Sequence, residues 1–220
     1  MIAYVFLSLF LIAAVFNVIG TRKPQGILFT VTKPMLLLTL CLYCITRQGE
    51  TDPLLVGALA ACWVGDILLM FPGEFWFTAG GVSFFAGHVM FVLIFARSTD
   101  LLAMPAALLI PAAAAYALAS GYVMFRARKK APKIMQIPML LYLFCNAATN
   151  LFALSRLWTA CGIWEAATYL GAVLFFLSDL ALFMLRYDTG RRRFYKTDTF
   201  VMITYISAVL LITLGLAPVC

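Results

Sequence analysis

Eight apolar runs of about 20 residues each make up most of the chain, and short polar segments separate them. In a bilayer every backbone N–H and C=O group needs a partner inside the protein, so runs of this length predict membrane-spanning helices. They exclude the short alternating strands of an outer-membrane barrel. The expected spans are residues 1–19, 28–46, 54–71, 77–96, 101–124, 136–155, 162–185 and 199–218.

The composition agrees with this interpretation. Hydrophobic residues make up 65% of the chain and charged residues 11%, which is too little charge for a water-soluble surface. The first run starts at Met1 without a basic stretch before it or a small-residue cleavage site after it, so we expect a retained helix. The predicted fold is an all-α polytopic membrane bundle that forms one domain over residues 1–220.

Lysine and arginine are distributed unevenly among the seven connections. The odd-numbered connections contain 13 of them and the even-numbered ones 3. The first group is Arg22, Lys23, Lys33, Arg126, Arg128, Lys129, Lys130, Lys133, Arg186, Arg191, Arg192, Arg193 and Lys196; the second is Arg47, Arg97 and Arg156. This bias predicts cytoplasmic odd connections, with both termini on the other side. We expect a bacterial inner-membrane protein whose net charge of +7 faces anionic lipid headgroups rather than nucleic acid.

Two aspartates lie deep inside the long apolar runs, away from the charged residues near the ends of these runs. Asp66 follows Gly65 in the third span, and Asp179 follows Ser178 in the seventh. With a rise of 1.5 Å per residue, both lie about 10 Å from the cytoplasmic end of their spans. An ionisable group at membrane depth is costly and usually functional, so Asp66 and Asp179 are the candidate catalytic residues.

The sequence also suggests that the two halves of the chain are related. Residues 34–37 open the second span as Pro-Met-Leu-Leu, and residues 138–141 open the sixth with the same four residues. Each aspartate lies in the third helix of a four-helix half. If an axis along the membrane normal relates the halves, Asp66 and Asp179 face each other across a central crevice.

Further polar residues lie within the spans. His88 is the sole histidine, and a lone buried histidine is more often a hydrogen-bonded core residue than a catalyst. Tyr142, Asn146 and Asn150 share one face of the sixth span. Such a stripe forms either interhelical hydrogen bonds or the lining of a wet cavity. Asn17 and Lys33 lie near the level of the aspartates, and Arg186 follows Asp179 by seven residues on the same face. These residues, with Ser178, complete the candidate site.

We expect no metal and no cofactor. One histidine is too few for a zinc hydrolase site. The six cysteines are scattered, mostly within spans, where cysteine behaves as a small apolar residue. They are Cys41, Cys44, Cys62, Cys145, Cys161 and Cys220. The first two have CxxC spacing but lie in mid-helix, which argues against a redox or metal role.

The order of motifs along nearly the whole chain resembles the YhhN/TMEM86 family of lysoplasmalogenases. These motifs are Lys33-Pro34, Gly65-Asp66-Ile67-Leu68-Leu69-Met70, Phe84-Phe85-Ala86-Gly87-His88, Gly171-Ala172 and Phe176-Leu177-Ser178-Asp179. The resemblance implies an eight-helix membrane enzyme that hydrolyses the vinyl ether bond of a lysophospholipid, the lysoplasmalogen. The products are a fatty aldehyde and glycerophosphocholine or glycerophosphoethanolamine. It also implies that Asp66 and Asp179 are the catalytic pair.

One position departs from the family pattern. The last span of the family carries a tyrosine followed one turn later by glutamine, whereas here Tyr205 is followed by Val209. The asparagine stripe of the sixth span is a second difference. Both changes affect the polar lining of the expected site.

Two nearby carboxylates suit vinyl ether hydrolysis. The reaction needs an acid that protonates the β-carbon and an anion that stabilises the resulting oxocarbenium ion, as in glycosidases. In low dielectric two neighbouring acids do not ionise together, so one keeps its proton. We expect Asp66 to be the donor and Asp179 the anion, because Arg186 shares its face. The lipid phosphate would meet Lys33 and Arg186 at the cytoplasmic boundary.

Two other interpretations use the same residues. In a proton-coupled transporter of small molecules or lipids, the aspartates would bind and release protons as the halves rock. In a purely structural interpretation, each aspartate binds a neighbouring hydroxyl, amide or arginine and orders the bundle. Two unpaired acids at one depth are expensive for that purpose alone, which favours a functional role.

Overall fold

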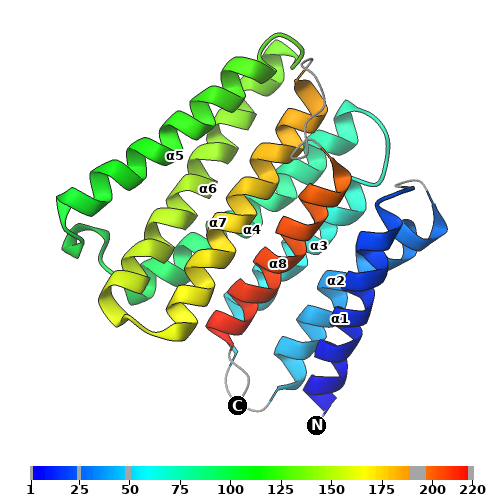
Figure 1. Cartoon of the computed structure of the whole chain (residues 1–220), viewed down its shortest axis with the longest axis horizontal. Coiled ribbons are helices and arrows are strands. Elements are labelled where there is room, and N and C mark those ends of the chain that lie inside the picture. The colour runs from blue at the N-terminus through cyan, green and yellow to red at the C-terminus, as the bar shows by residue number, and fades with distance from the viewer. Residues whose placement is uncertain (1, 24–25, 48–50, 189–196, 218–220) are drawn as a thin grey trace.

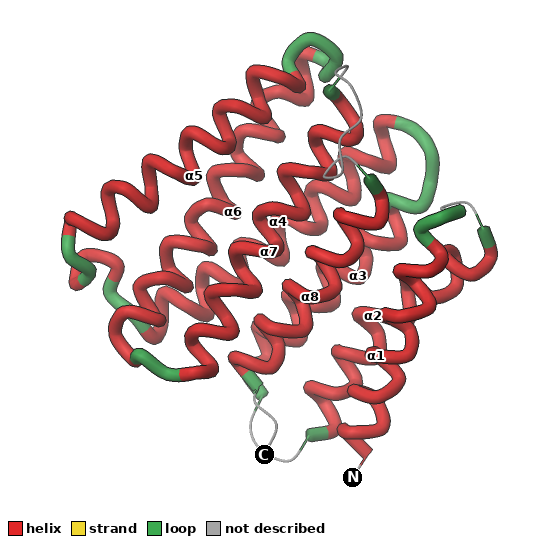
Figure 2. The backbone as a smooth tube through the Cα atoms, viewed as in Figure 1, coloured by secondary structure: helices red, strands yellow, loops and turns green. Residues whose placement is uncertain are grey.

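The computed structural model describes the chain except residues 1, 24–25, 48–50, 189–196 and 218–220. The described residues form eight α-helices and one short 3₁₀ helix (Figures 1 and 2). In chain order the elements are α1 (Ile2–Gly20), α2 (Ile27–Thr46), α3 (Pro53–Leu68), α4 (Glu74–Ser98), η1 (Leu101–Ala103), α5 (Ala106–Ala127), α6 (Lys133–Ala160), α7 (Ile163–Tyr187) and α8 (Asp198–Leu216). The prediction of an all-α polytopic bundle is confirmed.

Each expected span coincides with one helix, although the ends differ. The fifth span was expected to begin at residue 101, but α5 begins at Ala106. Proline disfavours a helical conformation in the residue before it, and Met104 accordingly has extended backbone before Pro105. The sixth helix is longer than expected, because α6 continues past residue 155 to Ala160.

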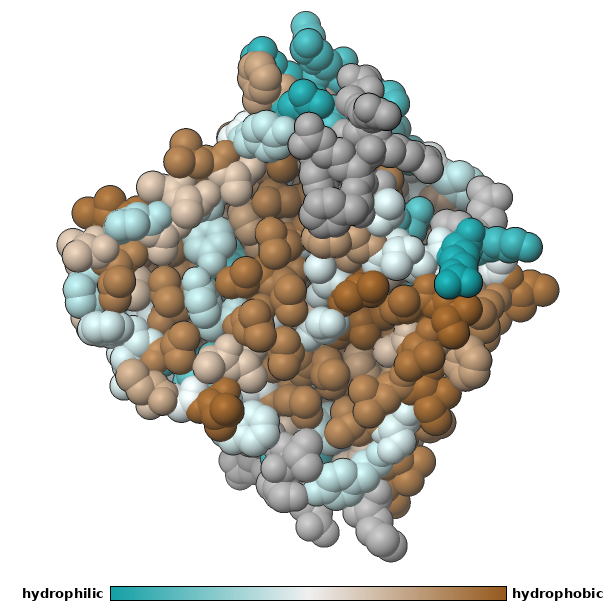
Figure 3. Space-filling view, viewed as in Figure 1, coloured by the Kyte–Doolittle hydropathy of each residue, from teal (hydrophilic) through white to brown (hydrophobic). Residues whose placement is uncertain are grey.

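Seven of the described helices are long and apolar enough to cross a membrane. The exception is α3, which has 16 residues and starts at Pro53 behind the N-cap residue Asp52. Apolar side chains cover the middle of the face shown in Figure 3, and hydrophilic side chains gather at its upper end. The chain is therefore an integral multi-pass membrane protein.

Consecutive helices pack as hairpins, and the inner helices enclose the centre of the bundle. The hairpins are α1 with α2, α3 with α4, α5 with α6, and α7 with α8. Contacts of α4 with α6 and of α8 with α2 join the two halves. α1 packs on α2 and α8, and α5 packs on α6 and α7, so both lie outside this centre (Figure 1).

Each helix that carries a candidate acid also contains a glycine at which a neighbouring helix approaches closely. A Cβ atom at Gly65 would lie 2.7 Å from the Phe84 ring and 3.2 Å from the carbonyl oxygen of Gly80. A Cβ atom at Gly171 would lie 2.9 Å from the carbonyl oxygen of Ala208. Small residues permit such backbone approach in membrane helices. The glycines thus set the positions of α3 against α4 and of α7 against α8.

The ends of the helices agree with an even number of crossings. The N-terminal end of α1 and the C-terminal end of α8 lie at the same end of the bundle (Figure 1). The α3–α4 and α5–α6 connections lie at the opposite end (Figure 1). The orientation of the bundle in the membrane remains a prediction from the loop charges.

Labelling of single cysteines tests this orientation. Cys161 is exposed at the α6–α7 connection, and Lys130 is exposed at the α5–α6 connection. In intact cells a membrane-impermeant maleimide should label a variant that keeps Cys161 alone. It should label Lys130→Cys in a cysteine-free chain only after the membrane is opened. The reverse pattern would mean that the positive connections lie outside.

Candidate functional site

Asp66 lies on α3 and is 2% exposed. The Lys33 ammonium on α2 lies 3.5 Å from its Oδ1, and the Tyr205 hydroxyl on α8 donates to its Oδ2 at 2.6 Å. The Trp63 indole donates to the carbonyl oxygen of Pro34 at 2.9 Å and fixes α2 against α3 beside this pair. Both oxygens of Asp66 therefore have partners.

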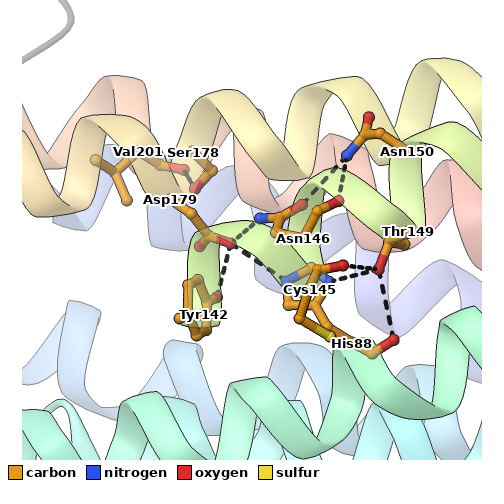
Figure 4. Close-up of polar contacts among 9 residues, drawn as sticks. All are labelled: His88, Tyr142, Cys145, Asn146, Thr149, Asn150, Ser178, Asp179 and Val201. Atoms are coloured by element: carbon orange, nitrogen blue, oxygen red, sulfur yellow. Dashed lines mark hydrogen bonds and ion pairs between the residues drawn. The ribbon is translucent and has the colours of Figure 1, made fainter. Parts of the chain in front are cut away.

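Asp179 lies on α7, and its contacts converge on one oxygen. The Tyr142 hydroxyl and the Asn146 amide donate to Oδ2 at 2.7 and 2.6 Å, and His88 Nε2 lies 3.3 Å from it (Figure 4). Oδ1 has no hydrogen-bond partner among the residues that the structure describes. Because a carboxylate oxygen has two lone pairs, Oδ2 is fully occupied and Oδ1 is left for another molecule.

A second layer of polar groups on α6 holds these partners. The Asn150 amide donates to the carbonyl oxygen of Asn146 at 2.9 Å and to its side-chain oxygen at 3.2 Å (Figure 4). The Thr149 hydroxyl lies 3.3 Å from His88 Nδ1 and 3.1 Å from the carbonyl oxygen of Cys145. The stripe on α6 thus forms interhelical hydrogen bonds and also orients the groups around Asp179.

The two aspartates have equivalent neighbours in the two halves of the chain. Asp66 receives its contacts from α2 and α8, and Asp179 receives its contacts from α6 and α4. Each acid on the third helix of its half is therefore bound by the second helix of the same half and the fourth helix of the other. Related four-helix halves would produce this pattern.

Aromatic rings occupy the space between the two sets of contacts. The Tyr205 ring lies 5.4 Å from the Phe175 ring and 5.9 Å from the Phe84 ring, measured between centroids. The Phe175 ring in turn lies 4.6 Å from the His88 imidazole. The edge-to-face geometry of these pairs is favourable, and the rings form an apolar wall that connects the surroundings of both acids.

The acids differ in their access to a cavity. Asp179 lines a narrow cavity of about 20 Å³, which is enough for about one water molecule. Its lining residues are Leu69, Phe77, Gly81, Phe84, Tyr142, Asp179, Leu182 and Phe183. Asp66 is not among them, because the Phe84 ring lies against its helix. Of the two acids, Asp179 is the one that a small molecule in this cavity meets.

Two residues that were expected to support the site contact other groups. The Ser178 hydroxyl donates to the carbonyl oxygen of Val201 at 3.0 Å, so it joins α7 to α8. The Asn17 amide donates to the Thr32 hydroxyl at 3.1 Å and joins α1 to α2. Both side chains stabilise helix pairs that carry the site.

The basic residues also lie in places that the sequence did not indicate. Lys33 was expected beside a lipid phosphate, but its side chain is buried against Asp66. Arg186 was expected to favour an ionised Asp179, but its guanidinium donates to Glu74 at 2.9 Å and lies over the Phe77 ring at 5.1 Å. Glu74 also accepts a bond from the Tyr187 hydroxyl at 2.8 Å.

Sequence reasoning missed several members of the site. Tyr205 was noted as the tyrosine of the last span, and that position was the available signal for its bond to Asp66. Phe84 and Phe175 carry no such signal, because apolar residues fill every span. Within the described residues, no group of three or more histidine, cysteine or acidic side chains is placed to hold a metal ion.

Comparison with known proteins connects this geometry to a family. The YhhN family matches residues 28–216, which include both aspartates and all the side chains that bind them. The chain belongs to the YhhN family. It is 30% identical over 182 residues to the human (Homo sapiens) protein named lysoplasmalogenase TMEM86B, covering 83% of this chain and 71% of the human protein. No solved structure matches the chain.

The buried ion pair predicts a strong effect on stability. Lys33→Met leaves the Asp66 carboxylate without its cation and should lower the free energy of unfolding by about 3 kcal/mol. Adding Asp66→Asn should recover a large part of that loss. Thermal unfolding in detergent measures both. Arg97→Met is the control, because its pair with Asp52 is exposed and contributes little. Equal stability of Lys33→Met and the unmodified protein would contradict a structural ion pair.

Proposed function

We propose that this protein hydrolyses the vinyl ether bond of lysoplasmalogens and releases a fatty aldehyde with glycerophosphocholine or glycerophosphoethanolamine. Membership of the YhhN family and similarity to a human lysoplasmalogenase support this proposal. One observation carries the proposal. The Asp179 carboxyl group accepts hydrogen bonds from Tyr142 and Asn146 at Oδ2 and lines a cavity, and among the described residues its Oδ1 has no hydrogen-bond partner.

The chemistry begins with a proton transfer to carbon. The acid protonates the β-carbon of the vinyl ether, and the double bond becomes an oxocarbenium ion centred on the α-carbon. A water oxygen then bonds to the α-carbon and loses a proton, which gives a hemiacetal. The hemiacetal breaks its bond to the glycerol oxygen, so the chain leaves as an aldehyde and the glycerol regains its hydroxyl group. The protein must supply one acid, one base and stabilisation of a cation.

Asp179 suits the role of acid and then base. In its protonated form it gives the proton from Oδ1 to the substrate, and negative charge then develops on the carboxyl group. Tyr142, Asn146 and His88 already surround Oδ2, so they stabilise that charge without rearrangement. The resulting carboxylate accepts the proton of the attacking water. The Phe84 ring lines the same cavity and favours a nearby cation through its π-face.

Asp66 suits the role of the ionised partner. The Lys33 ammonium lies 3.5 Å from its Oδ1 and the Tyr205 hydroxyl donates to its Oδ2, and both contacts favour the carboxylate form. This assignment reverses the one that the sequence suggested, in which Arg186 favoured an ionised Asp179. The reversal rests on two contacts, since Lys33 is paired with Asp66 and Arg186 is paired with Glu74.

Aldehyde release is the direct test of the proposed function. Purified protein should release free aldehyde from a lysoplasmalogen in detergent or liposomes, above a control without protein. The metal chelator EDTA should leave the rate unchanged, because the mechanism uses only side chains and water. If no aldehyde forms and the protein instead carries out proton-driven uptake in liposomes, the transporter interpretation replaces the enzyme.

Substitution of the acids tests the mechanism. Asp179→Asn and Asp66→Asn should each reduce aldehyde release by at least about 100-fold, because each removes a proton donor or a charge with little change of shape. The double variant should be scarcely slower than either single variant, since groups that act as a unit are not additive.

The matched control is another acid on the same helix as Asp179. Glu165 pairs with Arg156 at 3.1 Å near the start of α7, so Glu165→Gln should retain normal aldehyde release. Thermal unfolding confirms that each variant folds. Near-normal rates for both aspartate variants would mean that the acids serve only the structure.

A further inference from the structure

A larger apolar groove adjoins the cavity that contains Asp179. It has a volume of about 220 Å³ and lies between α4 and α6. The groove and the inner cavity share four lining residues, which are Phe77, Gly81, Tyr142 and Phe183. The rest of the groove is formed by Thr78, Val82, Phe85, Met135, Pro138, Met139 and Leu141. The groove therefore adjoins the inner cavity, and Asp179 lines the far side of that cavity.

The outer side of the groove faces the hydrocarbon of the bilayer. Val82 on α4 is 62% exposed and Leu141 on α6 is 56% exposed, and both belong to helices long and apolar enough to span the membrane. A molecule that enters between them comes sideways from the lipid and not from the aqueous loops. The polar groups at its inner end are the Tyr142 hydroxyl and the Asp179 carboxyl.

The chemistry of the groove fits one kind of occupant. Its walls are apolar, whereas its inner end holds an acid, so it suits a hydrocarbon chain with a reactive group at one position. The Arg186 guanidinium lies over the ring of Phe77, which lines both spaces. Arg186 also pairs with Glu74 at 2.9 Å, so a phosphate at the end of the same molecule would compete with Glu74 for this cation.

We infer that the α4–α6 groove is the lateral entrance for a single-chain ether phospholipid. The part of the chain next to the glycerol lies in the groove, and the ether carbons reach Oδ1 of Asp179. This inference rests on the proposed function and adds the route and position of the substrate to it. The groove has room for one chain segment, so a second acyl chain stays outside.

Gly81 keeps the entrance open. It lines both spaces at the point where they join, and a Cβ atom placed there would have no neighbour within 4 Å. A side chain added at this position therefore begins in open space beside the groove. Because alanine has a higher helix propensity than glycine, Gly81→Ala should also fold at least as well as the unmodified protein.

A graded series at position 81 tests the inference. Gly81→Leu should lower kcat/KM for a long-chain lysoplasmalogen by at least about tenfold, and Gly81→Phe by on the order of 100-fold, because a blocked approach misplaces the ether carbons. Gly81→Ala should have a small effect. Gly121→Leu on α5 is the matched control, since a Cβ atom there also meets nothing within 4 Å and the residue is outside the groove. It should leave kcat/KM unchanged.

A binding measurement separates this inference from the proposed function. The probe is a radiolabelled lysophospholipid with a saturated ether chain, which lacks the reactive double bond. Gly81→Phe should weaken its binding at least about tenfold relative to Gly121→Phe, with equal thermal unfolding of both proteins. If Gly81→Phe weakens binding but the unmodified protein releases no aldehyde, the groove is a lipid-binding site and the proposed hydrolase function is wrong. Equal binding by both folded variants would overturn the inference that the lipid chain enters through this groove.

Discussion

Burial of two carboxyl groups inside a membrane bundle is the constraint on which the rest of this structure depends. Between apolar helices, lipid tails compete equally with side chains, so hydrophobic contact alone specifies little. A buried acid instead requires donors in fixed places. The contacts of Asp66 and Asp179 come from α2, α8, α6 and α4, and the acids themselves lie on α3 and α7. Six helices are thus positioned by two side chains.

The two acids are surrounded by the same arrangement of helices but differ in their partners and in their access to the cavity. Asp66 has a partner on each oxygen, one of them a cation, and it does not line the cavity that reaches Asp179. Asp179 has neutral polar partners on one oxygen only and lines the cavity. The same arrangement of helices thus surrounds both acids, and in the proposed function only Asp179 exchanges a proton. The rings of Phe84, Phe175 and Tyr205 pack edge to face between the surroundings of the two acids.

The sequence predicted the helices and both acids because each has a one-dimensional signal. Long apolar runs predict the spans. A charged residue within such a run, such as Asp66 or Asp179, is easily recognised in the sequence. Partners were predicted less well, because distance in space is not visible in a single sequence. Arg186 follows Asp179 by about two helical turns, yet it pairs with Glu74 from another helix. Lys33 looked like a loop cation, but its long side chain reaches back into the bundle to Asp66.

The length of α3 has a consequence for the membrane around the protein. Its 16 residues extend over about 24 Å, whereas the hydrocarbon core of a bilayer is about 30 Å thick. A bilayer adapts to such hydrophobic mismatch by thinning or by letting headgroups descend. Asp66 lies two residues before the end of this helix at Leu68. Thinning of the bilayer around α3 would bring its interface closer to the Lys33–Asp66 pair.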